Sequence, residues 1–426
     1  MRFLHAEHPG RAVELAYCLN LHPSGDLAET LAGMNSITLP LRDRLGAGSG
    51  FGVGLYLCGA FAKALASGRN EHDLVELARF LALNSLHAFT YNAFPHAHFH
   101  EDGLKERVFE PTWREDERLA FTIHVAETAA RIAHETKRVE KGAHVSISTH
   151  SGMFGRNVKS PRDLDECAHQ FARAVDALAR IEEETGVHIV LAVEPEPRAS
   201  AGSSAELAAF LGKAFELGAV ILEDECNRDA AHAQALLRAH LGHCLDGCHA
   251  AVEGDVDPLA TLTGFTLGKI QYSNALVVEK PAENKAGLVA LLALAEPRYL
   301  HQVTGHGVRP MRATDLPELG ARLDTDERAA WLGCDRLVCH FHVPVDLASM
   351  GGGLTTTRAY ADRLLTDALA SPTLWGTRDL HVEIETYTWD ILPGRARGGG
   401  ELVDGLEREY RHVIGLLETA GWRRAD

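Results

Sequence analysis

The chain alternates between short apolar segments and longer amphipathic ones along almost its whole length. Helical periodicity is expected at 71–83, 115–136 and 164–185, among other places. The apolar segments are too short for buried helices and are bounded by polar or turn-forming residues, so we predict that they are buried strands. Buried strands that alternate with helices indicate a parallel sheet covered by helices. The nine strand candidates lie at 15–21, 51–57, 86–94, 144–150, 188–194, 241–246, 269–273, 337–343 and 380–386.

Eight or more strand–helix units close most readily into an α/β TIM-type (β/α)8 barrel. With nine candidates, one strand must lie outside the barrel, and the sequence does not identify which one. No repeat, linker or low-complexity tract divides the 426 residues. We therefore predict one domain over 1–426, with N-terminal and loop elaborations and a peripheral N-terminal arm at 1–13.

Charge and cysteine usage limit the partners and the compartment. The net charge is -17 and no run of lysine or arginine interrupts it, so no nucleic acid partner is expected. The sequence shows no signal peptide and no apolar run of membrane-span length. The eight cysteines include no CxxC pair, and several lie in apolar segments, which is typical of buried free thiols. We expect a cytoplasmic protein, and a homo-oligomer is compatible with the sequence.

Carboxylates occupy the ends of three strand candidates. The strand at 188–194 ends in Glu194, the next in Asp246, and the last carries Glu385; His249 follows Asp246 by three residues. In a barrel, chemistry collects where the carboxyl ends of the strands meet. Each carboxylate follows an apolar strand that would bury it, and a buried carboxylate must be paired or bind a metal. We predict a divalent metal site for manganese, magnesium, iron or zinc.

Each of these residues also has a less specific explanation when taken alone. Glu194 precedes a Pro-Glu-Pro segment and could be a solvated loop residue, and His249 could cap the helix that follows. His340, inside a strand, could be a hydrogen-bonded core residue. For Cys248, packing is favoured over reactivity, because the sequence arranges no basic residue to lower the pKa of the thiol. The three carboxylates at corresponding strand ends jointly favour the metal site.

The segments 244–249, 192–194 and 384–386 resemble the metal-binding strand ends of the xylose-isomerase-like TIM barrel superfamily. That group contains sugar isomerases and epimerases, inosose dehydratases and nucleases of the endonuclease IV type. Within it, the chain resembles the EboE family of metabolite traffic proteins, encoded in ebo gene clusters. Matching segments, among them 17–23, 271–276 and 383–390, cover nearly the whole chain in order. The resemblance implies the barrel and a divalent metal centre.

Carried over residue by residue, the resemblance implies that Glu194, Asp246 and Glu385 bind a central metal. The seventh strand end, often a histidine ligand in the superfamily, is Gln271 here. Its amide oxygen is a weaker ligand, which favours manganese or magnesium over zinc at that position.

His249 and His301 match positions that bind an additional metal in multinuclear members. The aspartate that would stand two residues before His301 is Tyr299 here, which argues against a complete three-metal site. Four further residues near strand ends are expected to contact substrate: Asn92, His100, His150 and His342.

The leading hypothesis is a metal-dependent isomerase or epimerase acting on a small sugar or cyclitol. Glu194 and Glu385 would exchange the proton as base and acid, and His249 or His301 would stabilise an enediolate oxygen. The ebo association implies a cyclitol or prenylated cyclitol in secondary metabolism. Two alternatives stay open: metal-dependent phosphoester hydrolysis of the endonuclease IV type, and a non-catalytic protein that binds and hands over a metabolite.

Overall fold

The computed structural model describes residues 1–48, 50–68, 71–392 and 399–425. Eight parallel strands form a ring, because β15 pairs with β8 on one side and with β2 on the other. This closed ring confirms the predicted α/β TIM-type barrel. Its strands are β2 (Ala12–Cys18), β3 (Phe51–Tyr56), β4 (Leu86–Asn92), β5 (Val145–His150), β6 (Ile189–Glu194), β7 (Leu241–Asp246), β8 (Thr266–Tyr272) and β15 (Asp379–Ile384).

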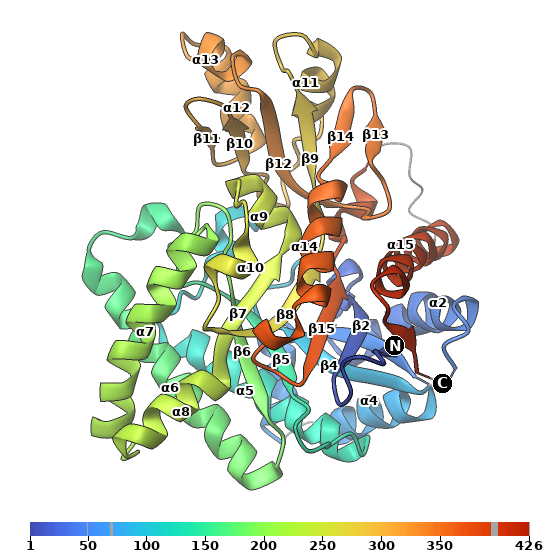
Figure 1. Cartoon of the computed structure of the whole chain (residues 1–426), viewed down its shortest axis with the longest axis vertical. Coiled ribbons are helices and arrows are strands. Elements are labelled where there is room, and N and C mark those ends of the chain that lie inside the picture. Colours follow the sequence, from blue (N-terminus) through green and yellow to red (C-terminus); the bar gives the residue numbers. More distant parts are fainter. Residues whose placement is uncertain (49, 69–70, 393–398, 426) are drawn as a thin grey trace.

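Helices surround the barrel in the lower part of Figure 1. The longest, α6, follows directly from its sequence: Ser160 and Asp163 form a capping box, and Gly186 ends the helix in the left-handed conformation at φ 72°. The helices of the barrel region are α1 (Leu27–Gly33), α2 (Leu39–Arg44), α3 (Gly59–Ala66), α4 (Glu71–Leu83), α5 (Asp116–Glu135), α6 (Pro161–Thr185), α7 (Ser204–Asp224), α8 (Ala230–His240), α9 (Gly247–Glu253), α10 (Pro258–Thr261), α14 (Arg358–Ala370) and α15 (Gly399–Thr419).

A second sheet, which we call the lobe sheet, stands above the barrel and is built from the chain between β8 and β15 (Figure 1). All of its pairings are antiparallel, in the order β11-β10-β12-β9-β14-β13. It has a hydrophobic core of its own, around Trp331 and Phe341. The elements are β9 (Asn274–Glu279), β10 (Val303–His306), β11 (Met311–Ala313), β12 (Arg336–Val343), β13 (Ser349–Gly351), β14 (Leu354–Thr356), α11 (Lys285–Leu292), α12 (Leu316–Leu323) and α13 (Arg328–Leu332).

The lobe sheet identifies the strand that the barrel does not use. The candidate at 337–343 is β12, which pairs with β9 and β10 in the lobe sheet rather than with any barrel strand. The other eight candidates correspond to the eight barrel strands. At the N-terminus, residues 1–13 comprise β1 (Arg2–Leu4), which pairs antiparallel with β2 and with β16 (Arg423–Arg424), and the first two residues of β2. Among the described residues, no helix is long and apolar enough to cross a membrane.

The interior of the barrel contains charge, whereas the interiors of most such barrels are filled by branched apolar side chains. The Lys269 ammonium lies 2.5 Å from a carboxylate oxygen of Glu383, and both side chains are fully buried. Lys269 also reaches across the barrel to the Ser148 hydroxyl, at 3.3 Å. Gly54 leaves the space that this pair occupies, since a Cβ there would lie 1.6 Å from Glu383 Oε1. Glu383 lies on β15 two residues before Glu385, so the buried ion pair lies in the barrel interior directly beneath Glu385.

Candidate metal centre

The carboxyl ends of β6, β7 and β15 bring three carboxylates together. Glu194 is the last residue of β6, Asp246 the last of β7, and Glu385 directly follows β15. One oxygen of each lies within 4.8 Å of the others, and no more than 4% of any of the three residues is exposed. Parallel strands in a barrel end at one mouth, which is why residues this far apart in sequence meet. We call Glu194, Asp246 and Glu385 the carboxylate triad.

The triad lies in a strongly anionic, buried environment. Burial raises the pKa of Glu194 to about 7; His249 opposes this shift, and Asp246 and Glu196 reinforce it. Burial also holds the pKa of Glu385 well above its usual range, and the charges of Glu194 and Asp246 add to this effect. Desolvated carboxylates this close together cannot all be ionised without a cation between them. A divalent ion would displace the protons that the triad otherwise retains.

Neighbouring polar groups hold two of the three carboxylates in place. The Ser273 hydroxyl donates to both oxygens of Asp246, at 2.9 and 3.0 Å, and the backbone N–H of His249 donates to Oδ1 at 2.7 Å. Asp246, rather than His249, therefore caps α9. Asn20 donates to Glu385 Oε1 at 2.7 Å. In contrast, Glu194 Oε2 is buried with no hydrogen-bond partner among the described residues.

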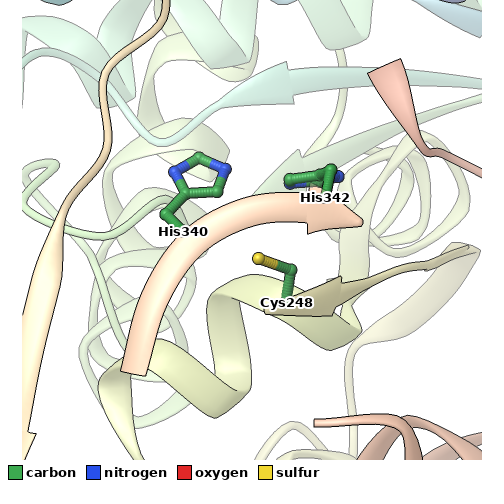
Figure 2. Close-up of side chains that lie close together, drawn as sticks. All are labelled: Cys248, His340 and His342. Atoms are coloured by element: carbon green, nitrogen blue, oxygen red, sulfur yellow. The ribbon is translucent and has the colours of Figure 1, made fainter. Parts of the chain in front are cut away.

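Three imidazoles converge beside the triad. His249 lies on α9, while His340 and His342 are two residues apart on β12 of the lobe sheet (Figure 2). His249 Nε2 lies 3.1 Å from Nε2 of His340 and 3.1 Å from Nε2 of His342. Glu196, in the loop after β6, places Oε2 3.0 Å from the same His249 nitrogen. We call His249, His340, His342 and Glu196 the histidine cluster.

The tautomers of two of these rings follow from their backbone partners. His249 Nδ1 lies 3.1 Å from the Pro195 carbonyl oxygen, and His342 Nδ1 lies 3.1 Å from that of Glu385. A carbonyl oxygen can only accept, so both Nδ1 atoms donate and both Nε2 atoms carry lone pairs when the rings are neutral. Facing lone pairs at this distance repel unless a cation lies between them. A backbone carbonyl that fixes the tautomer of a histidine is also the usual outer support of a metal ligand.

The protonation preferences of the cluster differ from ring to ring. Although burial disfavours the imidazolium of His249, Asp246 and Glu196 raise its pKa well above the usual range. Burial lowers the pKa of His342 to about 4 and holds that of His340 well below the usual range. Two of the three rings are therefore neutral at physiological pH, the form that ligates a metal ion.

The backbone of β12 is distorted where it enters the site. His342 has φ 34°, in the left-handed region, and the register with β9 shifts between Cys339 and Val343. A non-glycine residue in this conformation costs on the order of 1–3 kcal/mol and persists only where the surroundings impose it. The Thr388 hydroxyl donates to the His342 carbonyl at 3.0 Å and helps to hold this conformation. Such local strain is typical of functional positions.

Cys248 belongs to the packing beneath the histidine cluster. Its sulfur lies within 4.8 Å of a ring nitrogen of His340 and of His342, but the ribbon of β12 runs between the thiol and the two rings in Figure 2. Cys248 packs in a small apolar cluster with Val252, Ala275, Val277 and Val338. Burial raises the pKa of the Cys248 thiol to about 12, so it stays protonated.

A cavity of about 60 Å³ opens directly above both groups. Its floor is polar and consists of Glu194, Glu196, His249, His340, His342 and Glu385, with Asn20 and Asn92 beside Glu385. Its walls are largely hydrocarbon and aromatic: Phe94, Pro95, Phe99, Leu104, Val108, Tyr299, Leu300 and Tyr387.

Two cations line the cavity, and both are paired with carboxylates. Lys105 Nζ lies 2.8 Å from Asp315 Oδ2, and Arg298 Nη1 lies 2.6 Å from Asp390 Oδ2. Neither side chain is left as an uncompensated charge for an anionic substrate. The cavity therefore combines a floor of carboxylates and imidazoles, which are residue types that bind metal ions, with largely apolar walls.

The four residues expected to contact substrate separate into two pairs. Asn92 and His342 line the cavity. His100 is not among the lining residues, and its Nδ1 is hydrogen-bonded to the Tyr299 hydroxyl at 3.0 Å. His150 lies between the rings of Phe94 and Phe109, at 5.1 and 5.4 Å between centroids.

Two residues expected to bind metal lie outside both groups. Gln271 ends in the barrel interior, where its Oε1 accepts the Cys244 thiol proton at 3.0 Å and its Nε2 has no partner among the described residues. His301 supports the cluster from behind: Nδ1 donates to the His340 carbonyl at 2.9 Å, and Nε2 lies 3.0 Å from Glu296 Oε1. Its ring stacks on Phe341 at 3.8 Å.

Four residues of the site have no role that the sequence alone predicts. His340 could equally be a hydrogen-bonded core residue, and the sequence indicates no role for Glu196, Asn20 or Tyr387. The spacing of His340 and His342 by two residues was a usable signal, because alternate residues of a strand share a face. Tyr387, whose hydroxyl lies 3.2 Å from His340 Nε2, follows β15 closely, as Asn20 follows β2.

Comparison with known proteins adds little to this description. No protein-family model matches the chain. No curated protein matches it either. Among solved structures, it is similar to a crystal structure of the IOLI protein with a binding zinc atom, at 13% sequence identity and a TM-score of 0.45, over 96% of this chain and 99% of that chain. The barrel is assigned from its own strand pairing, independently of this likeness.

Proposed function

We propose that the protein is a metal-dependent enzyme of the isomerase or epimerase type, acting on a small polyhydroxylated metabolite. The observation that carries the proposal is the convergence of neutral imidazole lone pairs and buried carboxylates on one cavity floor. Such a donor set suits a divalent ion of the manganese, iron or zinc class. Barrel and lobe would act as one domain, because His340 and His342 of the lobe sheet complete a floor that the barrel begins.

The residues of the floor divide the chemistry between them. A divalent ion bound there would polarise two adjacent oxygens of the substrate and acidify the neighbouring C–H bond. Glu194, with a free buried oxygen, would take up that proton as general base. Glu385, oriented by Asn20, would return it as general acid. His249 would donate to the enediolate oxygen, and the apolar walls would keep water from the intermediate.

The walls favour a substrate that is not polar all round. A free sugar would leave its outer hydroxyl groups unpaired against Phe94, Phe99 and Leu300, at a cost of about 1–3 kcal/mol for each group. A cyclitol with an apolar substituent, such as a prenyl group, would satisfy both the floor and the walls. This substrate agrees with the resemblance to the EboE family within the xylose-isomerase-like superfamily.

Exchange of substrate protons with solvent tests the proposal. Full-length protein loaded with manganese or zinc would be incubated in heavy water with cyclitols and with their prenyl ethers. We expect deuterium incorporation at one carbon, and a decrease of at least 10²-fold in Glu194→Gln and in Glu385→Gln. Glu225→Gln, an exposed carboxylate paired with His169, is the matched control and should exchange as the wild type does. Unchanged exchange in Glu194→Gln would refute the assignment of this base.

One observation favours a second candidate function, metal-dependent phosphoester hydrolysis. Asp246 belongs both to the carboxylate triad and to a group with His249 and His342. A shared carboxylate between two ligand sets is the arrangement expected for two neighbouring ions, which catalyse phosphoryl transfer. Two tightly bound zinc ions per chain and cleavage of bis(p-nitrophenyl) phosphate would favour hydrolysis. Ligand binding without exchange or cleavage would instead favour a metabolite carrier.

A further inference from the structure

We propose that Glu182, His188 and His240 form a separate site for a divalent transition metal of the zinc class, at the opposite end of the barrel. Glu182 lies in the last turn of α6, His188 directly precedes β6, and His240 is the last residue of α8, directly before β7. Glu194 and Asp246 of the carboxylate triad lie at the other ends of these same two strands, β6 and β7. This site, which we call the amino-end site, therefore shares no ligand with the candidate metal centre.

The three candidate ligand atoms lie close enough together for small movements to place them around one metal ion. Glu182 Oε2 lies 2.8 Å from His188 Nδ1 and 3.3 Å from His240 Nε2. One ligating atom of each residue lies within 4.8 Å of the others. Zinc–nitrogen and zinc–oxygen bonds of about 2.0–2.1 Å in tetrahedral geometry place ligand atoms roughly 3.3 Å apart. Small side-chain adjustments would bring all three onto one ion.

The tautomer of His240 points to a cation at this position. Its Nδ1 donates to the backbone carbonyl of Ile189 at 2.8 Å, so Nε2 of the neutral ring carries a lone pair. That lone pair faces a carboxylate oxygen of Glu182, and two acceptors at 3.3 Å repel each other. Either a proton or a metal ion must lie between them.

In the amino-end site, a backbone carbonyl orients one histidine, and one side of the site is open to solvent. A histidine that donates its second N–H to a backbone carbonyl is the usual form of a metal ligand. His240 is buried, whereas 26% of the His188 side chain and 40% of the Glu182 side chain are exposed. Two imidazoles and one carboxylate leave the fourth position of a tetrahedral ion open to solvent. An ion there would link α6, β6 and α8, so we infer a structural role in holding this part of the barrel closed.

Zinc binding to full-length, chelator-stripped protein tests the amino-end site. Titration would compare the wild type with His188→Ala and with Glu182→Gln. His169→Ala is the matched control, because His169 also lies on α6 and pairs with one glutamate, Glu225, at 2.8 Å, in an exposed position. We expect the two site variants to bind one zinc ion fewer per chain, or to bind it at least 10-fold more weakly. The control should match the wild type.

Hydrogen exchange measured by mass spectrometry locates the ion and keeps the test valid if a variant does not fold. In the wild type, added zinc should slow exchange in peptides that cover 182–190 and 237–242. The same zinc should give no protection there in His188→Ala or Glu182→Gln. Equal zinc stoichiometry and affinity in all four proteins, or no zinc-dependent protection of these peptides in the wild type, would overturn the proposal and leave a proton as the shared cation.

Discussion

His249 and His342 face each other through their Nε2 atoms at 3.1 Å, although each ring donates its Nδ1 proton to a backbone carbonyl. The two residues come from different parts of the molecule: His249 lies on α9, directly after barrel strand β7, and His342 lies on β12 of the lobe sheet. Either the proton of a His249 imidazolium or a metal ion must therefore lie between the two Nε2 atoms, and the same reasoning applies at the amino-end site. The contact also shows that the lobe sheet is part of the site rather than an appendage.

Replacement of His342 by asparagine should separate metal binding from stability. Asparagine tolerates the positive φ at this position and removes the imidazole. We expect the unfolding free energy to stay within about 1 kcal/mol of the wild type, while zinc affinity falls at least 10–100-fold. Isothermal titration and urea unfolding measure the two quantities. Cys248→Ala is the control, since the thiol only packs, and it should retain zinc affinity.

Removal of the buried cation inside the barrel should be strongly destabilising. Lys269→Met leaves the Glu383 carboxylate buried without its partner, and we expect a loss of about 3–5 kcal/mol in urea unfolding. The double variant Lys269→Met with Glu383→Gln should recover most of that loss, because no lone charge remains. Lys213→Met removes a partly exposed pair with Asp165 and should cost less than about 1 kcal/mol. A similar cost for both lysine variants would contradict the assignment of the interior pair.

Gly54 should not accept a side chain. A Cβ at this position would overlap Glu383 Oε1, so Gly54→Ala must displace the interior ion pair. We expect at least about 1–3 kcal/mol of destabilisation, the usual cost of overpacking a core. Gly212→Ala in α7 is the control, because no atom beyond its chain neighbours and the adjacent helix backbone lies within 4 Å of its added Cβ. That change should be neutral or stabilising by up to about 1 kcal/mol.

Glu409 should make stability depend on pH near neutrality. Burial, with the charge of Asp346, raises its pKa to about 8 from an ordinary value of 4.5. Between these two pH values the folded protein keeps a proton that the unfolded chain loses. The contribution of Glu409 to the free energy of unfolding is therefore fully present below pH 4.5 and is lost as the pH rises through about 8.

Glu409→Gln stays neutral and should remove this component. We expect the melting temperature of the variant, relative to the wild type, to rise between pH 5 and about 8 and to level off above that pH. Thermal melts in buffers of constant ionic strength measure the difference. A constant difference across this range would show that Glu409 does not hold its proton in the folded protein.

The barrel was predictable because its signals are local. A buried parallel strand such as Ile189–Glu194 is apolar up to its last residue, and the amphipathic pattern over 164–185 marks the helix α6 that precedes it. Closure into a ring followed from the number of units. The strand at 337–343 has the same local character, because it too is buried, so its pattern could not place it outside the barrel.

The sequence by itself determined the alternation of strands and helices, because this alternation is visible in the local pattern of apolar residues. It also determined that Glu194, Asp246 and Glu385 lie at corresponding strand ends, because each is the polar residue at the end of an apolar segment. Only the tertiary structure decided that β12 lies outside the barrel and that its His340 and His342 lie at the barrel mouth. They contact His249 there although they are 91 and 93 residues away from it in sequence. The same holds for His301 and Gln271, which lie beside the site without entering it. The physical reason is that a histidine in an apolar strand has the same local sequence pattern whether it binds a metal, packs in the core or donates to a carbonyl. Its role depends on the partner that another element brings to it in the folded chain.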